Sequence, residues 1–375
     1  MTVPDWSALP RDVLTFFAKR ITSLKDYIAF RAVCRAWRLA ATMDCFPTTR
    51  QVPWLVLFRV LHDPEPSWRF HSLTKNKVHK PLLPFQPHLD RHICSSLGWM
   101  MGRGENADQH HLYLWHPLTH AQVQLPNHNF NFDTAKFALS SSPSWTSDYA
   151  IMVIFNEYSN SEPSYLRRAP CNVAFLKPGA LMWTNIKLSQ PAEDLAYYKG
   201  QFYVVDCEGK LMVLDIEDPD HDVIKMKEIV SVDYGSLKKV LDGKYPSHSY
   251  RQEDDQYYIV ESERALFLVQ RNNVWKRSYW FQPYHEIVEF HVFEVNTSNK
   301  TLARLNSLGD KTLFFGSGPS LSVKVSGDTG CKVDCIYFNM GCVTGIFDMK
   351  KEGFETLKHE GVHPFIPLPW LQQSF

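Results

Sequence analysis

Cysteine and histidine side chains gather at two places where a metal ion could bind. The two groups are Cys331, Cys335 and Cys342, and His110, His111, His116 and His120. The cysteine spacing, C-x3-C-x6-C, is not a zinc pattern, and no fourth ligand lies nearby in the sequence. The histidines straddle an expected strand and turn, so strand alternation would spread them over both faces of a sheet. The sequence therefore predicts no metal site and no cofactor.

The chain also lacks the short motifs of nucleophilic catalysis. It contains no G-x-S-x-G elbow and no H-E-x-x-H pair. Residues 316–318 read Gly-Ser-Gly, but the Lys-Ser or Lys-Thr pair of a phosphate-binding loop does not follow. The acidic residues 253–255 fit a solvated loop. We expect a protein that is not an enzyme, and keep catalysis as a lesser alternative because triads assemble in space rather than in sequence.

The overall charge argues against two classes of partner. Lys and Arg total 40 and Asp and Glu total 40, so the formal net charge is zero. A chain that binds nucleic acid or an anionic membrane usually carries a basic excess. Apolar residues at 44% and charged residues at 21% allow an ordinary globular core, and 14% aromatic residues favour a body rich in β-structure.

Nothing in the sequence suggests a membrane or a secretory route. The most apolar stretch, residues 54–61, is too short to span a bilayer and contains Arg59. The first residues do not have the charged start and apolar run of a signal peptide. Eight cysteines in 375 residues fit a reducing compartment. We expect the protein in the cytoplasm, the nucleus or both.

The first segment is expected to be helical. Residues 12–19 place Val13, Leu14 and Phe17 on one face at helical spacing. Pro10 lies just ahead, where its fixed φ suits a helix start.

A longer helical run is expected over residues 27–43, which contain neither Gly nor Pro. Ser23 is the expected cap of a short turn before it. The apolar members of the run occupy more than one face, so one face can serve the module's own core and another a partner. They are Ile28, Phe30, Val33, Cys34 and Trp37.

Beyond residue 53 the pattern changes to short apolar runs separated by turn signals, which is typical of hairpins. The best example spans residues 195–214, with turns at 199–200 and 206–209 whose Gly residues supply the positive φ. Further strands are expected at residues 98–101, 112–115, 123–126, 173–176, 181–183, 257–260, 266–269, 287–295, 302–305, 313–315, 335–338 and 345–347.

Repeated antiparallel meanders over this length need a closed arrangement, or they leave exposed strand edges. A β-propeller satisfies this need, and a blade of four strands takes about 40 to 50 residues. The length predicts six or seven blades, and we favour six. A pair of stacked β-sandwiches is the competing architecture.

The N-terminal residues resemble the F-box in three blocks. Residues 6–14 resemble the opening of the motif, residues 20–26 its middle, and residues 30–38, with Val33-Cys34-Arg35 and Trp37, its ending. The match covers residues 4–45 with the spacing of the motif.

The remainder resembles the plant F-box-associated propeller family known as domain of unknown function 295. The blocks that carry this resemblance are Gly98-Trp99, residues 117–119, 125–126, 293–295, 308–310, 313–316, 335–338 and 345–348. Residues 128–170 and 216–255 match less well. The fold class is therefore a small all-α F-box followed by an all-β propeller of about six blades, with domains at residues 4–45 and 50–375.

This resemblance implies the substrate receptor of an SCF-type ubiquitin ligase, which also contains a Skp-type adaptor, a cullin and a RING protein. The F-box would bind the adaptor, and the propeller would bind an unidentified target for ubiquitylation. Such a receptor acts by proximity and supplies no nucleophile. The candidate adaptor-binding residues are Leu9, Pro10, Val13, Leu14, Ile28, Val33, Cys34 and Trp37.

A second hypothesis keeps the propeller but not the ligase. In it, the propeller sequesters or scaffolds a protein such as a kinase, and the F-box is degenerate. The intact blocks at residues 9–10 and 33–37 argue against degeneration. The enzyme alternative would need a tight pocket at the propeller axis with convergent carboxylates or histidines.

Overall fold

The structure is a computed structural model of the 375-residue chain. It describes residues 5–21, 24–42, 45–46, 52–59, 67–73, 77–79, 94–106, 109–128, 131–156, 171–218, 223–233, 255–276, 284–316, 318, 320–326, 329–340, 343–357 and 365–372.

The N-terminal part is a helical module made of a 3-10 turn and three short α-helices. They are η1 (Trp6–Ala8), α1 (Arg11–Ala18), α2 (Leu24–Ala32) and α3 (Arg35–Ala40). Asp5 caps η1, since its Oδ1 accepts a hydrogen bond of 3.0 Å from the backbone N–H of Ser7. Pro10 stands directly before α1, as expected from its fixed φ.

The single long helix expected over residues 27–43 is wrong. The backbone becomes extended at Cys34, with φ −162° and ψ 174°, and this residue then caps α3. The interruption lets α3 pack against α2, with the rings of Phe30 and Trp37 4.4 Å apart between centroids. A straight helix would keep residues seven apart on one stripe, facing a common neighbour rather than each other. Ser23, the expected cap, lies outside the described residues.

The module has a small core of its own. Its buried members are Ala18, Tyr27, Ala41, Cys45 and Phe46. The rings of Tyr27 and Phe46 are tilted against each other with centroids 5.0 Å apart, and Thr15 Oγ1 donates a hydrogen bond of 3.1 Å to the Ala40 carbonyl. A module of this size buries little apolar surface, so we expect its stability to depend on neighbours.

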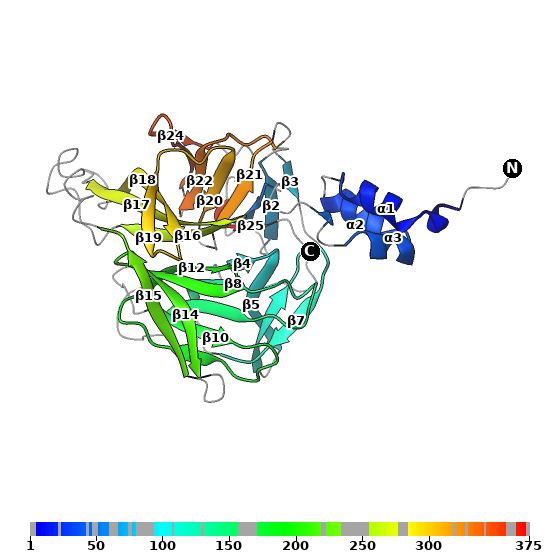
Figure 1. Ribbon diagram of the computed structural model, residues 1–375, viewed down its shortest axis with the longest axis horizontal. Coiled ribbons are helices and arrows are strands. Elements are labelled where there is room, and N and C mark those ends of the chain that lie inside the picture. Colours follow the sequence, from blue (N-terminus) through cyan, green and yellow to red (C-terminus); the bar gives the residue numbers. More distant parts are fainter. Residues whose placement is uncertain are drawn as a thin grey trace.

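Six sheets follow and are arranged as the blades of a propeller (Figure 1). The first contains β25 (Phe365–Leu371), β1 (Trp54–Arg59), β2 (Ser67–Ser72) and β3 (Lys77–His79). The second contains β4 (Cys94–Ser96), β5 (Trp99–Asn106), β6 (Gln109–Trp115) and β7 (Gln122–Leu125). The third contains β8 (Asn131–Leu139), β9 (Ile151–Asn156), β10 (Cys171–Leu176) and β11 (Thr184–Ile186).

The fourth blade contains β12 (Ala192–Tyr198), β13 (Gln201–Asp206), β14 (Lys210–Asp218) and β15 (Val223–Ser231). The fifth contains β16 (Gln256–Ser262), β17 (Ala265–Lys276), β18 (Tyr284–Asn296) and β19 (Thr301–Leu305). The sixth contains β20 (Lys311–Phe315), β21 (Leu321–Lys324), β22 (Cys335–Met340), β23 (Val343–Asp348) and β24 (Gly353–Thr356). Six blades confirm the favoured architecture over stacked sandwiches.

The strand β25 closes the ring by pairing antiparallel with β1, far away in sequence. Its Trp370 is 1% exposed, and the indole Nε1 donates a hydrogen bond of 2.8 Å to the Phe315 carbonyl of the sixth blade. The Trp370 carbonyl accepts a hydrogen bond of 2.8 Å from Ser95 Oγ of the second blade. This one strand therefore ties three blades together.

The meander over residues 195–214 is confirmed as β12, β13 and the first part of β14. Gly209 has φ 76°, and a Cβ at this position would lie 2.7 Å from the Tyr257 ring, so both the turn and the packing require glycine. The strand expected at 181–183 is wrong: Leu181 and Met182 belong to a turn and are 87% and 79% exposed, and β11 begins only at Thr184.

A buried polar group links the inner strands at the propeller axis. Asp194 of β12 is fully buried and pairs with Lys136 of β8 at 3.1 Å. Its other oxygen accepts hydrogen bonds from the Ile259 N–H of β16, at 3.0 Å, and from Ser320 Oγ, at 2.8 Å. One carboxylate thus joins four blades, and each of its oxygens is satisfied.

Candidate adaptor-binding surface

The helical module exposes large apolar side chains that a folded domain normally buries. They are Trp6 (62% exposed), Phe16 (53%), Phe17 (51%), Val33 (56%) and Leu39 (58%). Water-facing aromatic and aliphatic groups on so small a module indicate a surface that a partner covers.

The eight residues predicted to contact an adaptor occupy three environments. Pro10 and Val33 are exposed, and Leu14 is buried at 1% exposure. Those that are partly buried are Leu9, Val13, Ile28, Cys34 and Trp37. Ile28 packs against the module's core cluster. The geometry thus offers Pro10 and Val33 most directly to a partner, whereas Leu14 supports the module from inside.

Trp37 organises one side of the module. Its indole Nε1 donates a hydrogen bond of 3.0 Å to the Trp6 carbonyl, and its ring lies against Phe30. Cys34 starts the helix that carries it. The ending block of the motif therefore holds η1, and hence the exposed Trp6 ring, in place.

Phe16 and Phe17 form a second exposed apolar group, which sequence reasoning did not select. Their ring centroids lie 5.9 Å apart, edge to face. The Arg20 guanidinium lies 3.4 Å above the Phe16 ring, and its Nη1 donates a hydrogen bond of 3.1 Å to the Phe16 carbonyl. The predicted helical stripe grouped Phe17 with Val13 and Leu14, but Leu14 is buried whereas Phe17 is half exposed. The sequence signal for these exposed residues is an apolar helix face that is wider than the small core of the module can cover.

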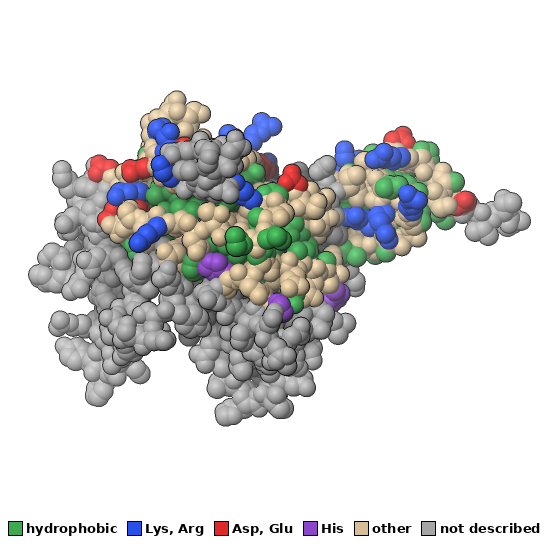
Figure 2. Space-filling view, turned by 90° about the horizontal axis from the view of Figure 1, so that it is seen from below, with side chains coloured by type: hydrophobic (Ala, Val, Ile, Leu, Met, Phe, Trp, Pro, Cys, Tyr) green, Lys and Arg blue, Asp and Glu red, His purple; other side chains and the backbone are tan. Residues whose placement is uncertain are grey.

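The module is also basic, unlike the chain as a whole. Residues 1–45 carry seven Lys and Arg against four Asp and no Glu. Figure 2 shows Lys and Arg side chains beside apolar ones on the face of the module that it presents. An apolar surface with a basic rim fits a partner whose own rim is acidic, because such complementarity speeds and orients docking.

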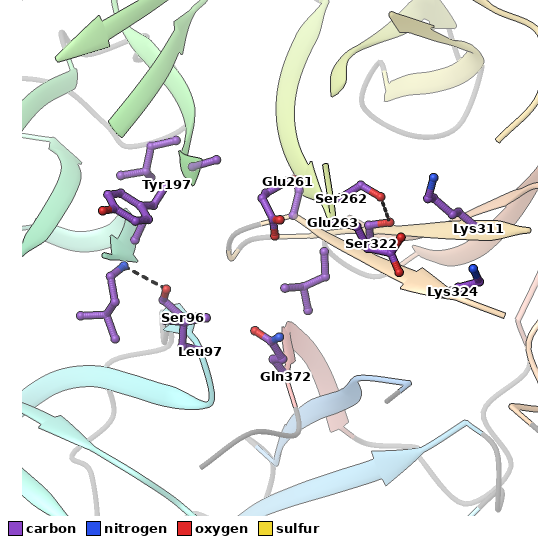
Figure 3. Close-up of a pocket in the computed structure, with 16 residues that line it drawn as sticks. Ser96, Leu97, Tyr197, Glu261, Ser262, Glu263, Lys311, Ser322, Lys324 and Gln372 are labelled. Carbon is purple, nitrogen blue, oxygen red and sulfur yellow. Dashed lines mark hydrogen bonds between the residues drawn. The ribbon is translucent and has the colours of Figure 1, made fainter. Parts of the chain in front are cut away.

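A cavity of about 110 Å³ lies where the inner strands of the propeller converge (Figure 3). It receives residues from all six blades, including Ser96, Leu139, Tyr197, Glu261, Ser322 and Gln372. Burial, and secondarily the neighbouring charge of Glu263, raises the pKa of the Glu261 carboxyl. Ser320, which also lines the cavity, connects it to the buried Asp194.

The described lining of this cavity does not form a catalytic set. Ser262 and Ser322 hydrogen-bond to each other at 2.8 Å, and no histidine is among the lining residues. Glu261 and Glu263 come from one strand end rather than converging from two sides (Figure 3). A nucleophile with an adjacent base is the arrangement that hydrolytic chemistry needs, and the described residues do not supply it here.

The two groups of possible metal ligands do not converge. Burial raises the pKa of the Cys331 and Cys335 thiols to about 11, so both stay protonated at neutral pH. His116 is buried within a turn, whereas His120 is exposed. Cys342 and the His110 side chain lie outside what the structure describes. Among the described residues, no three His, Cys, Asp or Glu side chains come together as a metal site.

The sequence of this chain matches a known family of β-propellers. The family model of the KIB1-4 β-propeller matches residues 70–363. The chain belongs to the KIB1-4 β-propeller family. The matched region covers all of the second to sixth blades and, in the first blade, β3 and the end of β2.

The curated relatives of this chain have the F-box in their names. F-box protein SKIP23 of Arabidopsis thaliana is 23% identical, over 91% of this chain and 85% of that protein. F-box protein At2g26160 of Arabidopsis thaliana is 23% identical, over 90% of this chain and 96% of that protein. These matches confirm the resemblance to plant F-box proteins with a propeller.

Two further observations complete the comparison. The solved structure of TolB from Acinetobacter baumannii aligns with a TM-score of 0.38 at 10% identity, over 92% of this chain and 70% of that one. A score this low supports no argument. No helix in the described part of the chain has the length and apolar content needed to cross a bilayer.

Proposed function

We propose that this protein is a substrate receptor of an SCF-type ubiquitin ligase. The helical module binds a Skp-type adaptor, and through it a cullin, while the propeller binds the target protein. The observation that carries the proposal is the set of exposed apolar side chains on a module whose sequence has the F-box blocks. The names of the relatives support the same role at the level of the family.

In this role the protein needs no cofactor and performs no chemistry. It raises the local concentration of a target lysine near a charged ubiquitin-conjugating enzyme. The balanced total charge supports a protein target rather than nucleic acid or membrane. A reducing compartment, the cytoplasm or nucleus, fits its free cysteines, among them the buried Cys45 and Cys94.

Co-purification of the full chain with a Skp-type adaptor tests the proposal. The wild type is compared with the double variant Leu9→Ala and Pro10→Ala. We expect the variant to lose adaptor binding while its propeller keeps the wild-type melting temperature. If a folded wild-type chain does not bind the adaptor, the ligase role is wrong, and partners of the propeller alone should be sought.

A further inference from the structure

We infer that the turn between β6 and β7 in the second blade orients the helical module on the propeller. The inference rests on the proposed function only in its consequence, that the turn also orients a bound adaptor. Leu118, in this turn, is partly buried against the module's core cluster of Ala18, Tyr27, Ala41, Cys45 and Phe46. A side chain of the propeller therefore completes the core of the module.

The turn is built to hold Leu118 in one position. His116 is 1% exposed, and its Nδ1 accepts hydrogen bonds from the backbone N–H groups of Leu118 and Thr119, at 3.3 and 3.2 Å. The His116 backbone is bonded in both directions, accepting from the His120 N–H and donating to the Ala121 carbonyl, each at 2.9 Å. Because Nδ1 accepts, it carries no proton in this arrangement.

Aromatic packing within the second blade also fixes the His116 imidazole. The rings of Trp99 and His116 meet edge to face with centroids 5.4 Å apart. Trp99 is itself 1% exposed, and its Nε1 donates a hydrogen bond of 3.0 Å to Ser142 Oγ of the third blade. Leu118 is thus presented by a turn that is anchored in the propeller core rather than by a loose surface loop.

In the described part of the chain, Leu118 provides a point of attachment between the two parts in addition to the connecting chain. The connecting chain is the first such point: Phe46 is buried in the module and Val52 in a propeller core cluster with Leu55 and Leu57. A single covalent connection permits rotation about it. A second, separate contact on another blade removes that freedom, so the module takes one orientation.

The strand registers show at which end of the ring this contact lies. Ser96 pairs with Trp99, and Met100 pairs with Trp115, so the turns after β4 and after β6 lie at the same end of the blade. Ser96 and Leu97 line the axial cavity. The module consequently lies at the cavity end of the ring, and in Figure 1 its helices lie on the side of the ring that carries β3 and β7.

Four variants of the full chain separate this role from a general loss of stability. Leu118→Ser removes the contact, and Leu181→Ser is the matched control, since Leu181 is 87% exposed in the corresponding turn of the third blade. His116→Ala removes the acceptor inside the turn. His116→Asn restores an acceptor near the same place, because the Asn side chain forms turns with the N–H groups two and three residues on.

The measurement is single-molecule FRET on the full chain, alone and with a bound Skp-type adaptor. The dyes are attached through unnatural amino acids at the exposed positions Asp26 and Lys300. We expect one narrow distance distribution for the wild type, for Leu181→Ser and for His116→Asn. We expect a distribution at least twofold broader for Leu118→Ser and His116→Ala, with adaptor affinity changed less than threefold.

A second readout follows the function. In a reconstituted ligase, mass spectrometry of self-ubiquitylation should find few modified lysines on the wild type and more, at different positions, on Leu118→Ser. An unchanged FRET distribution in Leu118→Ser would overturn the inference, whatever the adaptor does. Failure of the wild type to bind the adaptor would overturn the proposed function instead, and the FRET of the free chain would still decide the orientation.

Discussion

The helical module and the propeller differ in how far they bury their large apolar side chains. Of the ten large apolar side chains that are exposed in the described part of the chain, five lie between Trp6 and Leu39, and the other five lie in the third and sixth blades of the much longer propeller. The propeller encloses its own, as the fully buried Trp99, Phe314 and Trp370 show. The difference leads us to expect that the small module depends more on neighbouring groups, such as Leu118, than the propeller does.

The two parts also differ in charge. The module carries an excess of Lys and Arg, and the rest of the chain carries the compensating excess of Asp and Glu. A net charge of zero therefore conceals two regions of opposite sign. Salt should weaken binding at the module more than it weakens the propeller, where the axial ion pair is shielded from solvent.

The largest expected effect is on ring closure. Trp370→Ala leaves a cavity beside Phe314 and removes the hydrogen bond to the Phe315 carbonyl. We expect a loss of about 3–5 kcal/mol in propeller stability, measured by urea unfolding followed through tryptophan fluorescence. Trp145→Ala, at a 45% exposed position, is the control and should change stability little. Equal losses in both variants would contradict a special role for β25.

Next comes the axial carboxylate. Asp194→Asn leaves the Lys136 ammonium, whose side chain is only 13% exposed, without its counter-ion. We expect a loss of about 3 kcal/mol in stability, read from the thermal midpoint. Adding Lys136→Met should recover part of the loss, because the unpaired charge is then gone. No recovery would show that the hydrogen bonds to Ile259 and Ser320 matter more than the charge.

A substitution on the module tests whether adaptor binding depends on the module's exposed apolar surface and not on the propeller. Val33→Asp places a charge on the exposed apolar surface, and we expect adaptor affinity to fall at least tenfold, about 1.4 kcal/mol, in surface plasmon resonance. The propeller melting temperature should stay within one degree or so of wild type, since exposed substitutions are usually near neutral. Leu181→Asp, at an even more exposed position on the third blade, should bind as the wild type does. Loss of binding in both would point to misfolding or nonspecific repulsion.

The smallest expected effect is on the pH dependence of folding stability. Burial raises the pKa of the Asp206 carboxyl, against the opposing hydrogen bonds from the Lys210 and Glu208 N–H groups. The folded state therefore holds this proton to a higher pH than the unfolded state. Its contribution to stability falls as pH rises from the unfolded value, about 3.9, through the raised folded value.

Asp206→Asn tests this dependence. It keeps an acceptor in the turn and removes the titration, so stability near pH 7 should be equal or slightly higher. Denaturant midpoints at pH 4 and pH 7 provide the measurement. A variant that is less stable than wild type at pH 7 would show that the ionised carboxylate is favourable where it lies.

The sequence predicted the parts of the fold that depend on local chemistry. Apolar runs and glycine turns located β12 to β14, and the F-box blocks located the helices. It missed the break at Cys34, because no Gly or Pro marks it and the break depends on α3 packing against α2. It also took Leu181 and Met182 for a strand, since apolar runs look alike whether buried or exposed.

The candidate site was predicted in part for the same reason. Residue types identified Val33 and Pro10, which are exposed, but not Phe16 or Leu39, whose exposure depends on which faces of the helices stay uncovered. Leu14 was selected by the helical stripe and lies in the core. The domain limits at residues 45 and 50 stay predictions. The contact made by Leu118 joins residues far apart in sequence, and no local sequence pattern predicts it.

The pairing of β25 with β1 also sets an order of events during synthesis. The helical module leaves the ribosome before the blades, so under the proposed function it can meet an adaptor while most of the blades are still being translated. The ring cannot close until Trp370 has emerged, more than 300 residues after its partner strand. Under the proposed function, an mRNA truncated late in its coding sequence would therefore yield a chain that still binds adaptors but has an open propeller. Such a product would compete with every other receptor in the cell for the same adaptor, so a late truncation would act as an inhibitor rather than as a simple loss.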